Sequence, residues 1–172
     1  MAIVFPLTTE RLSIRPFTEA DRETMRRIYA DPDVMRFIDT RGEDPATWVD
    51  GYIAHQASHG YAFWAIEERA TGELLGEAGF GPLDGVGPEL ELGYLLRHDA
   101  WGRGLATEAA RACLDAAFGG LGVREVVAVV DIGNDASLRV LWKVGFRVEG
   151  WRTAHGRRQH VLRAVAGDGL PA

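Results

Sequence analysis

The strongest constraint on the fold is a junction between a short apolar segment and an alanine-rich one. The segment ELELGYLLR has the residues and length of a buried strand, and Leu105–Phe118 carries apolar residues at helical spacing. Between them, Gly102 and Gly104 bracket Arg103. Glycines at such a place cost conformational entropy, so the backbone there must do something that a side chain would obstruct. The junction therefore predicts a strand, a specialised turn and a helix.

Three kinds of glycine-rich turn must be distinguished. A nucleoside-triphosphate loop needs a lysine and then Ser or Thr after its last glycine, and Leu105 and Ala106 stand there instead. A dinucleotide fingerprint needs a small residue where Thr107 stands and belongs after the first strand of a repeated unit. What remains is a turn whose N–H groups bind an anion at the positive end of the helix. A turn without a ligand has about equal weight on the glycines alone.

Composition narrows the class of protein. The 172 residues are 47% hydrophobic and 26% charged, which predicts one globular domain over residues 1–172. The net charge of −6 argues against a nucleic-acid partner. The single cysteine, Cys113, excludes an internal disulfide and fits a reducing compartment. No apolar segment is long enough to cross a membrane and Met1–Glu10 lacks the features of a signal peptide, so we expect a cytoplasmic protein without membrane contact.

The rest of the chain alternates strand and helix patterns without repeats. Strands are expected at residues 9–17 (at a sheet edge), 62–68, 73–81, 89–96, 124–130, 146–151 and 160–165. Helices are expected after Thr18, from Pro45 onward, at 105–118 and at 134–144. This order predicts a mixed α/β sheet with helices on its faces.

The turn has a close counterpart in a known family. Residues 101–106, WGRGLA, resemble the pyrophosphate-binding loop of the GNAT superfamily of acyl-CoA-dependent N-acyltransferases, with Trp101 where the general form has Gln or Arg. That departure is typical of the RimJ/RimL-like branch, which acetylates N-termini of ribosomal proteins. The likeness continues, in the same order along the chain, through TERLSIRPF, DPDVMRFI, ELGYLL and NDASLRVLWKVGF, and it does not extend beyond Trp151.

The resemblance implies a fold and a cosubstrate. It implies a central, mostly antiparallel, twisted sheet of six to seven strands with about four helices on its faces, and acetyl-CoA as cosubstrate without a metal. The pantetheine arm would lie between the strands at Glu89–Leu96 and Glu125–Val130. Cofactor contacts are then expected from Tyr94, Leu95, Leu96, Trp101, Gly102, Arg103, Gly104, Leu105, Ala106, Thr107, Asn134, Arg139 and Lys143. Asn134 also fits a helix cap, and Arg139 and Lys143 also fit plain solvated charges.

Acetyl transfer to an amine requires a base, because an ammonium group has no lone pair. It also requires donors for the developing oxyanion, for which backbone N–H groups on the central strand would serve. Glu91, two residues before Gly93 in ELELGY, matches the acidic residue that this branch places there. Strand alternation places Glu89 and Glu91 on one face, which would be a solvent face in the simplest reading. The match favours Glu91 as the base and does not extend to Glu89.

The leaving thiolate benefits from a proton donor. Many GNAT enzymes use a tyrosine seven residues after the asparagine, where this chain has Leu141. Ser137 matches a serine of the branch, although a serine in the first turn of a helix also satisfies local amides. Tyr94 is a second candidate donor, and a packed aromatic role suits it as well.

The acceptor site is weakly marked. Aromatic and apolar residues that would suit it, and that would equally suit the core, are Met35, Phe37, Trp48, Tyr52, Trp64 and Phe80. No cluster of carboxylates in the sequence indicates a polyamine pocket, so a peptide or protein N-terminus is the family's default acceptor. Small-molecule amines and a non-catalytic acyl-CoA-binding module remain open, as does the choice between monomer and homodimer. His55 and His59 have the spacing of zinc ligands but lack the accompanying glutamate and third ligand.

Overall fold

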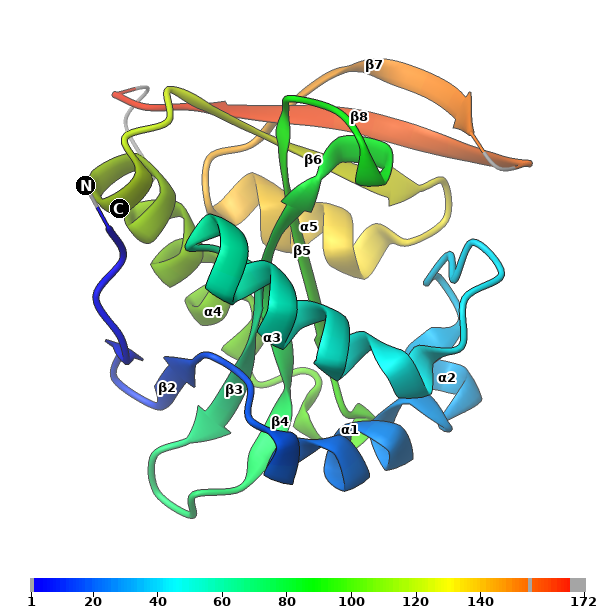
Figure 1. Cartoon of the computed structure of the whole chain (residues 1–172). Helices are drawn as coiled ribbons and strands as arrows, with labels where there is room; N and C mark the ends of the chain where they lie inside the picture. The colour runs from blue at the N-terminus through cyan, green and yellow to red at the C-terminus, as the bar shows by residue number, and fades with distance from the viewer. Residues whose placement is uncertain (1, 155, 168–172) are drawn as a thin grey trace.

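The computed structural model describes residues 2–154 and 156–167, in which the chain forms one twisted sheet covered by helices (Figure 1). The strands are β1 Leu7–Thr8, β2 Leu12–Arg15, β3 Phe63–Glu68, β4 Leu74–Pro82, β5 Leu90–Leu96, β6 Glu125–Asp131, β7 Arg147–Ala154 and β8 Arg157–Val165. The helices are α1 Arg22–Tyr29, α2 Pro32–Met35, α3 Trp48–His59, α4 Leu105–Asp115 and α5 Asp135–Lys143, and α4 ends in a π-helical turn, Ala116–Leu121.

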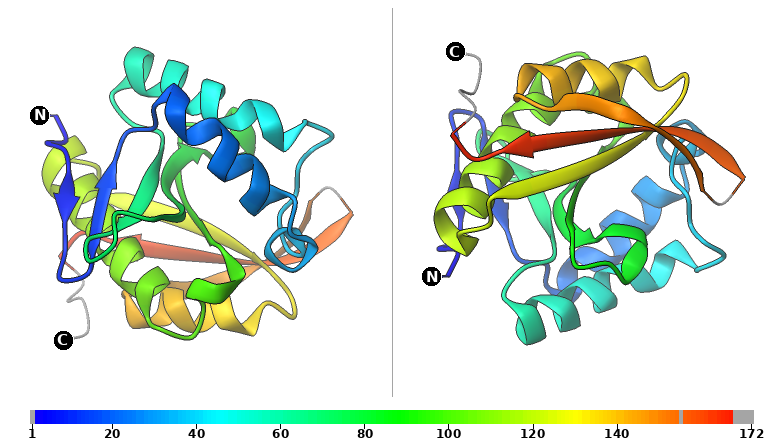
Figure 2. Two further views of the ribbon diagram at one scale, coloured as in Figure 1. Left: turned by 90° about the horizontal axis from the view of Figure 1, so that it is seen from below. Right: turned by 90° about the horizontal axis from the view of Figure 1, so that it is seen from above.

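The strand order is β1-β2-β3-β4-β5-β6-β8-β7. Neighbouring strands are antiparallel except β5 and β6, which run parallel. Among the described residues these two strands are paired at one position, Glu91 opposite Val127, and then diverge (Figure 2). The gap that opens beyond this pair lies in the middle of the sheet.

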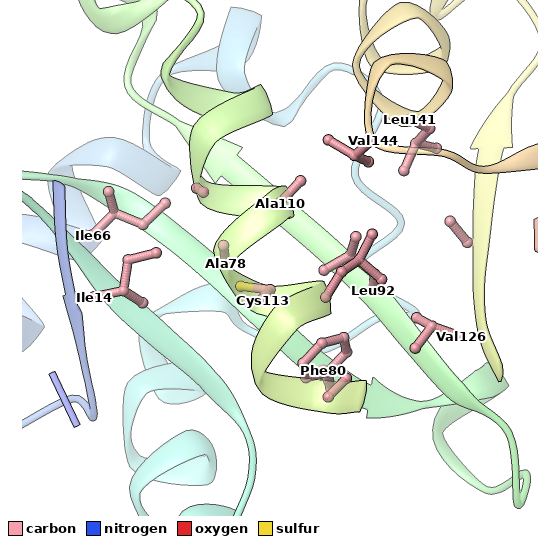
Figure 3. Packing of buried hydrophobic residues seen from close by; sticks show 14 of the residues in the cluster. Ile14, Ile66, Ala78, Phe80, Leu92, Ala110, Cys113, Val126, Leu141 and Val144 are labelled. Atoms are coloured by element: carbon pink, nitrogen blue, oxygen red, sulfur yellow. The ribbon is translucent and has the colours of Figure 1, made fainter. Parts of the chain in front are cut away.

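The helices lie in two layers, with α1 and α3 on one face of the sheet and α4 and α5 on the other (Figure 2). Strand β5 serves both layers, because its side chains alternate between the faces. Leu92 packs with the core under α4 and α5, whereas Leu95 packs with Met25 and Val49 of the other layer. Figure 3 shows Cys113 of α4 among the buried side chains of the first of these cores.

The helix boundaries follow local sequence signals. Thr18 and Asp21 form the expected capping box ahead of α1. Asp44 accepts a hydrogen bond from the N–H of Ala46, and Pro45 opens the 3-10 turn that leads into α3. Gly60 ends α3 with a φ of +79°, a conformation that glycine adopts without strain.

The expected mixed α/β sheet with helices on its faces is confirmed, with eight strands where six to seven were expected and five α-helices instead of four. The additional strand, Leu7–Thr8, is too short to show an alternating pattern, and it displaces β2 from the predicted sheet edge. The additional helix, Pro32–Met35, is one turn that starts where Asp31-Pro32 was expected only to end a helix. No helix of the described residues is long and apolar enough to cross a membrane.

Candidate active site

A cavity of about 630 Å³ lies where β5 and β6 part. Its walls come from both layers of helices, from the segment before α3 and from the β7–β8 hairpin. The side chains and backbone that line it include Phe37, Trp48, Tyr52, Phe63, Glu77, Glu91, Tyr94, Leu95, Asn134, Ser137 and Arg152. A volume of this size is typical of small-molecule sites.

The glycine turn lies between β5 and the first turn of α4. Gly102 and Gly104 have φ values of +72° and +79°, in the left-handed region that side chains rarely adopt. Gly104 is the N-cap of α4 and supplies no side-chain cap, so the first N–H groups of this helix have no side-chain partner there. An added Cβ on Gly102 would meet no atom within 4 Å. The turn thus presents open backbone donors at a helix N-terminus, which suits a phosphate.

Side chains around the turn fix its shape. The indole N–H of Trp101 donates to the carbonyl of Leu96 at 2.8 Å. A guanidinium N–H of Arg11 donates to the carbonyl of Arg103 at 2.7 Å, and Arg11 itself is paired with Glu108 of α4 at 2.6 Å. The Arg103 guanidinium is engaged with Glu68 at the end of β3. Trp101 and Arg103 therefore hold the loop in place, and Arg11 and Glu108, which sequence reasoning missed, anchor it to the N-terminal segment.

Glu91 lines the cavity at the position where β5 and β6 are paired. Burial raises the pKa of its carboxyl group, and the nearby charges of Arg41 and Arg152 oppose that rise. Arg152 in turn holds Asp84 through two hydrogen bonds of 2.8 Å. A half-buried carboxylate with a raised pKa in a cavity has the properties of a general base. Glu89, by contrast, pairs with Arg163 at 3.0 Å and is absent from the cavity wall that the described residues form.

Tyr94 and Ser137 meet on the α5 side of the same cavity. The Tyr94 hydroxyl lies 2.8 Å from Ser137 Oγ and 3.1 Å from the Ser137 carbonyl. Burial raises the pKa of Tyr94, which keeps its proton on the oxygen. Leu141, at the position of the usual family tyrosine, is fully buried in the core. The structure thus joins the two candidate proton donors in one pair.

A family model described as an acetyltransferase (GNAT) domain matches residues 11–147. The chain belongs to the GNAT acetyltransferase family. YkkB and the N-acetyltransferase YoaA, both uncharacterised proteins of Bacillus subtilis, are 35% identical over 143 residues and 33% identical over 153 residues. The aligned parts cover 81% of this chain and 83% of YkkB, and 86% of both this chain and YoaA. A crystal structure of an acetyltransferase from Agrobacterium tumefaciens matches with a TM-score of 0.80 at 32% identity, covering 95% of this chain and 96% of that one.

Acetyl-CoA is the cosubstrate that the GNAT family implies, and the cavity fits its narrow arm. Beyond the single β5–β6 pair, Tyr94 and Leu95 line the gap, where an extended amide chain would bind as an added strand does. Leu96 does not line the cavity within the described part of the chain, and its carbonyl already accepts the Trp101 indole N–H. Asn134 lines the gap and caps α5 by accepting the Ser137 N–H at 3.2 Å, which leaves its side-chain NH₂ group for a ligand.

The remaining cofactor candidates differ in position. Leu105 is buried in the core, whereas Ala106 and Thr107 are half-buried in the first turn of α4. Arg139 and Lys143 are exposed on α5 and are absent from the cavity wall that the described residues form. Both side chains could contact the nucleotide part of acetyl-CoA at the surface, or could simply be charges exposed to solvent.

The acceptor candidates separate into two groups. Phe37, Trp48 and Tyr52 line the cavity, and Phe80 borders it although its ring is fully buried in the core. Two further candidates lie elsewhere, since among the described residues Met35 and Trp64 are absent from the cavity wall. Met35 packs with the core under α1 and α3, and the Trp64 indole is fully buried with its N–H bonded to Gln56 at 2.8 Å. Trp64 is therefore a core aromatic residue, which is the alternative that its residue type also allowed.

Sequence reasoning missed Glu77, which is 4% exposed and lies in the middle of β4. Its carboxylate accepts hydrogen bonds from the hydroxyls of Tyr29 at 2.5 Å and Tyr52 at 3.3 Å. Burial raises the pKa of Glu77 to about 7, against the opposing effect of the two hydroxyls. The sequence feature that could have identified Glu77 is its position as the single acid inside the apolar segment LLGEAGF.

The histidine pair is also located near the cavity. His55 and His59 stack with ring centroids 4.1 Å apart, and His55 lines the cavity. No group of three His, Cys, Asp or Glu side chains that could hold a metal occurs among the described residues.

Proposed function

We propose that this acetyltransferase moves the acetyl group of acetyl-CoA to a primary amine by direct attack, and that a protein or peptide N-terminus is the preferred acceptor. The observation that carries the proposal is that Glu91 and the Tyr94–Ser137 pair line one cavity, at the point where β5 and β6 part. A base and a proton donor on either side of a gap that fits a thioester arm are what direct transfer needs.

In this proposal Glu91 takes a proton from the acceptor ammonium, directly or through one water. The free amine then attacks the thioester carbonyl, and backbone N–H groups of β5 stabilise the oxygen on which negative charge develops. As the carbon–sulfur bond breaks, the nitrogen loses its second proton to water and the Tyr94–Ser137 pair gives a proton to the sulfur, which it later regains from water. The products are a neutral amide and free CoA. The roles match the burial of Glu91, which makes it basic, and the raised pKa of Tyr94, which keeps it protonated.

Binding of the cosubstrate is assigned to backbone groups. The N–H groups of residues 102–106 would hold the pyrophosphate at the positive end of α4, where the glycines leave the backbone open. The Asn134 NH₂ group would bind an amide of the pantetheine arm. These contacts need no metal.

A second candidate function is transfer to a small-molecule amine. The cavity volume of about 630 Å³ and its aromatic lining support it, because pockets of this size and character enclose small ligands. A non-catalytic acyl-CoA-binding module is the third candidate, and the placement of Glu91 argues against it.

A thiol-release assay with acetyl-CoA and a panel of amines tests these candidates together. The panel contains peptides that begin with Ala or Ser, free amino acids, polyamines and aminoglycosides, and acetyl-CoA binding is measured in parallel. Faster release with peptides supports the proposal, and faster release with one class of small amine supports the second candidate. Binding of acetyl-CoA without release to any acceptor would overturn both.

A further inference from the structure

Glu77 takes no part in the proposed acetyl transfer. This carboxylate is buried on β4 and lines the cavity, and its partners are the neutral hydroxyls of Tyr29 and Tyr52. No Lys or Arg of the described residues forms an ion pair with it. Burying a carboxylate without a cation is costly, so the ionised form of this acid would be stabilised by a positive partner.

The wall of the cavity between Glu77 and Glu91 is formed by two glycines and by aromatic rings. Gly81 and Gly93 lie in the two strands that carry these acids, and the Phe63 ring packs on them. A Cβ on Gly93 would lie 2.7 Å from that ring, so the position leaves no room for a side chain. The Tyr52 ring lies beside Phe63, with the ring centroids 5.1 Å apart. Aromatic rings over a bare backbone form a surface on which an alkyl chain can lie.

The strand register fixes how far apart the two acids are. Glu77 is opposite Leu95 on β5, and Glu91 is opposite Gly81 on β4. Positions 91 and 95 are on the same face of β5 and four residues apart, which is on the order of 13 Å along the strand. The two carboxylates therefore lie at opposite ends of one face of the cavity.

The charges around the cavity favour a cation. Two arginines, Arg41 and Arg152, line it together with six acids, which are Asp39, Glu43, Glu77, Asp84, Glu91 and Asp131. Arg152 is already bonded to Asp84, and Asp131 is paired with Arg157 of β8 at 2.5 Å, so the excess of negative charge comes from the other acids. An acceptor with positive charge at both ends would fit this distribution better than a neutral or anionic one.

We propose that Glu77, with Tyr29 and Tyr52, forms a second subsite that binds an ammonium group of the acceptor about one nanometre from the amine that reacts at Glu91. The inference rests on the proposed function and specifies its acceptor as a molecule with two amines. Such a molecule is either a free alkyl diamine or a peptide whose N-terminal amine is followed by a lysine. In both, the remote ammonium replaces the missing cation beside Glu77.

Ionisation of Glu77 makes the subsite sensitive to pH. The titratable groups that face this carboxylate are Tyr29 from α1 and Tyr52 from α3, and the neighbours opposite Glu77 on β3 and β5 are Ala65 and Leu95. Its pKa of about 7 means that the ionised form grows as pH rises through neutrality. A remote ammonium, whose own pKa is near 10, is charged throughout this range. Preference for a diamine over a monoamine should therefore increase from pH 6 to pH 8.

The test compares octylamine with 1,8-diaminooctane as acceptors for the wild type, Glu77→Gln and Glu23→Gln. Glu23 is the matched control, because it is an exposed acid of α1 paired with Arg26 and Arg27 and lies outside the cavity wall. We expect the wild type to prefer the diamine by about 10- to 100-fold in kcat/KM, the range for a charged hydrogen-bonded contact. Glu77→Gln should lower this ratio to near one by raising KM for the diamine, while Glu23→Gln keeps it.

Two further experiments identify whether the remote ammonium belongs to a diamine or to a peptide, and control for misfolding of the variant. The dipeptide amides Ala-Lys and Ala-Gln repeat the comparison for a peptide acceptor. The ratio of kcat/KM for Ala-Lys over Ala-Gln is compared with that for the diamine over the monoamine, and the larger ratio identifies the kind of molecule that carries the remote ammonium. If Glu77→Gln does not fold, as judged by its thermal unfolding, the wild-type pH series decides. Equal rates for diamine and monoamine, or a ratio that is unchanged by Glu77→Gln or flat with pH, would overturn the inference. Transfer to the monoamine in the same assays shows that acetyl transfer to a primary amine holds independently of the second subsite.

Discussion

The two faces of β5 differ in how their functional residues are distributed along the chain. On the face under α4 and α5, Tyr94 meets Ser137, and the proposed cofactor contacts come from two short segments that follow β5 and β6. On the face under α1 and α3, Glu77, Tyr29 and Tyr52 come from three separate elements. The proposed cofactor face is thus built from contiguous motifs, whereas the proposed acceptor face is assembled by tertiary packing. Substitutions on each face test this division.

The largest effect is expected at the acceptor face. Glu91→Gln keeps the shape of the side chain and removes the base, so we expect kcat to fall by about 10²- to 10⁴-fold with a modest change in acetyl-CoA affinity. The loss should shrink at high pH, where the acceptor amine loses its proton unaided. The measurement is the pH dependence of steady-state turnover with one good acceptor.

Glu89→Gln is the matched control, because Glu89 pairs with Arg163 outside the cavity. It should leave turnover near the wild-type value. An unchanged rate for Glu91→Gln at neutral pH, with chemistry shown to be rate-limiting, would place the base elsewhere on this face.

The second effect concerns the cofactor face. Gly104→Val places a branched side chain at a φ of +79° in the turn and should raise the Kd for acetyl-CoA by about 10- to 100-fold, through loss of charged contacts to helix-terminal amides. Gly60→Val is a close control, because Gly60 has the same φ of +79° and ends α3 outside the cavity wall. Calorimetric titration measures both.

The two glycine variants should lose similar stability, because both force a side chain into the left-handed region at about 1–2 kcal/mol. They should differ in acetyl-CoA affinity alone. If Gly104→Val binds acetyl-CoA as tightly as Gly60→Val, the turn is not the phosphate site.

A smaller effect is expected for the proton donor. Ser137→Ala should lower kcat by about 10-fold, less than Glu91→Gln, because the thiolate is a good leaving group and helix-terminal amides stabilise it. Since Tyr94 and Ser137 share a hydrogen bond of 2.8 Å, the double variant with Tyr94→Phe should be less than additive in a mutant cycle. Wild-type activity of Ser137→Ala beside a crippled Tyr94→Phe that still binds acetyl-CoA would assign the donor to Tyr94.

The smallest effect is a shift in pH dependence. The charge of Arg152 lowers the pKa of Glu91, so Arg152→Gln should raise that pKa further and move the acid limb of the kcat/KM profile to higher pH. Activity well above the limb should change little, because Glu91 is ionised there in both proteins. Arg158→Gln, which removes an arginine that stacks on Trp151, serves as the control. A limb that stays in place or moves to lower pH would separate Arg152 from the base.

The fold was largely predictable because its signals are local. Capping residues, prolines and strand alternation determined most element boundaries, and the capping box at Thr18 and Asp21 is an example. The short β1 and α2 escaped because two- and four-residue elements carry no measurable period. Their existence depends on strand pairing and on packing against α1.

The candidate site was easiest to predict where its residues belong to contiguous motifs. Gly102, Gly104 and Asn134 belong to contiguous motifs, and the structure places them beside the gap or at the start of α4. On the face under α1 and α3, Glu91, Trp48 and Tyr52 were expected and line the cavity, whereas Glu77 was missed. The sequence shows no cluster of carboxylates, yet folding brings six acids to one cavity from separate segments. Trp64 illustrates the reverse case, because its residue type suits a pocket and only tertiary burial shows that it belongs to the core.

The single pairing of Glu91 with Val127 has a mechanical consequence. Among the described residues, the sheet consists of two hydrogen-bonded blocks, one of β1 to β5 and one of β6, β8 and β7. One backbone pair and the helices that cross the boundary join the two blocks. An extended ligand in the gap between β5 and β6 would hydrogen-bond to both strands, so its amides would replace the strand pairs that are absent there and connect the two blocks. We therefore expect amide hydrogens of β6 and β8 to exchange faster than those of β3 and β4 in the free protein. With the ligand bound between β5 and β6, all four strands should exchange at a common, slower rate.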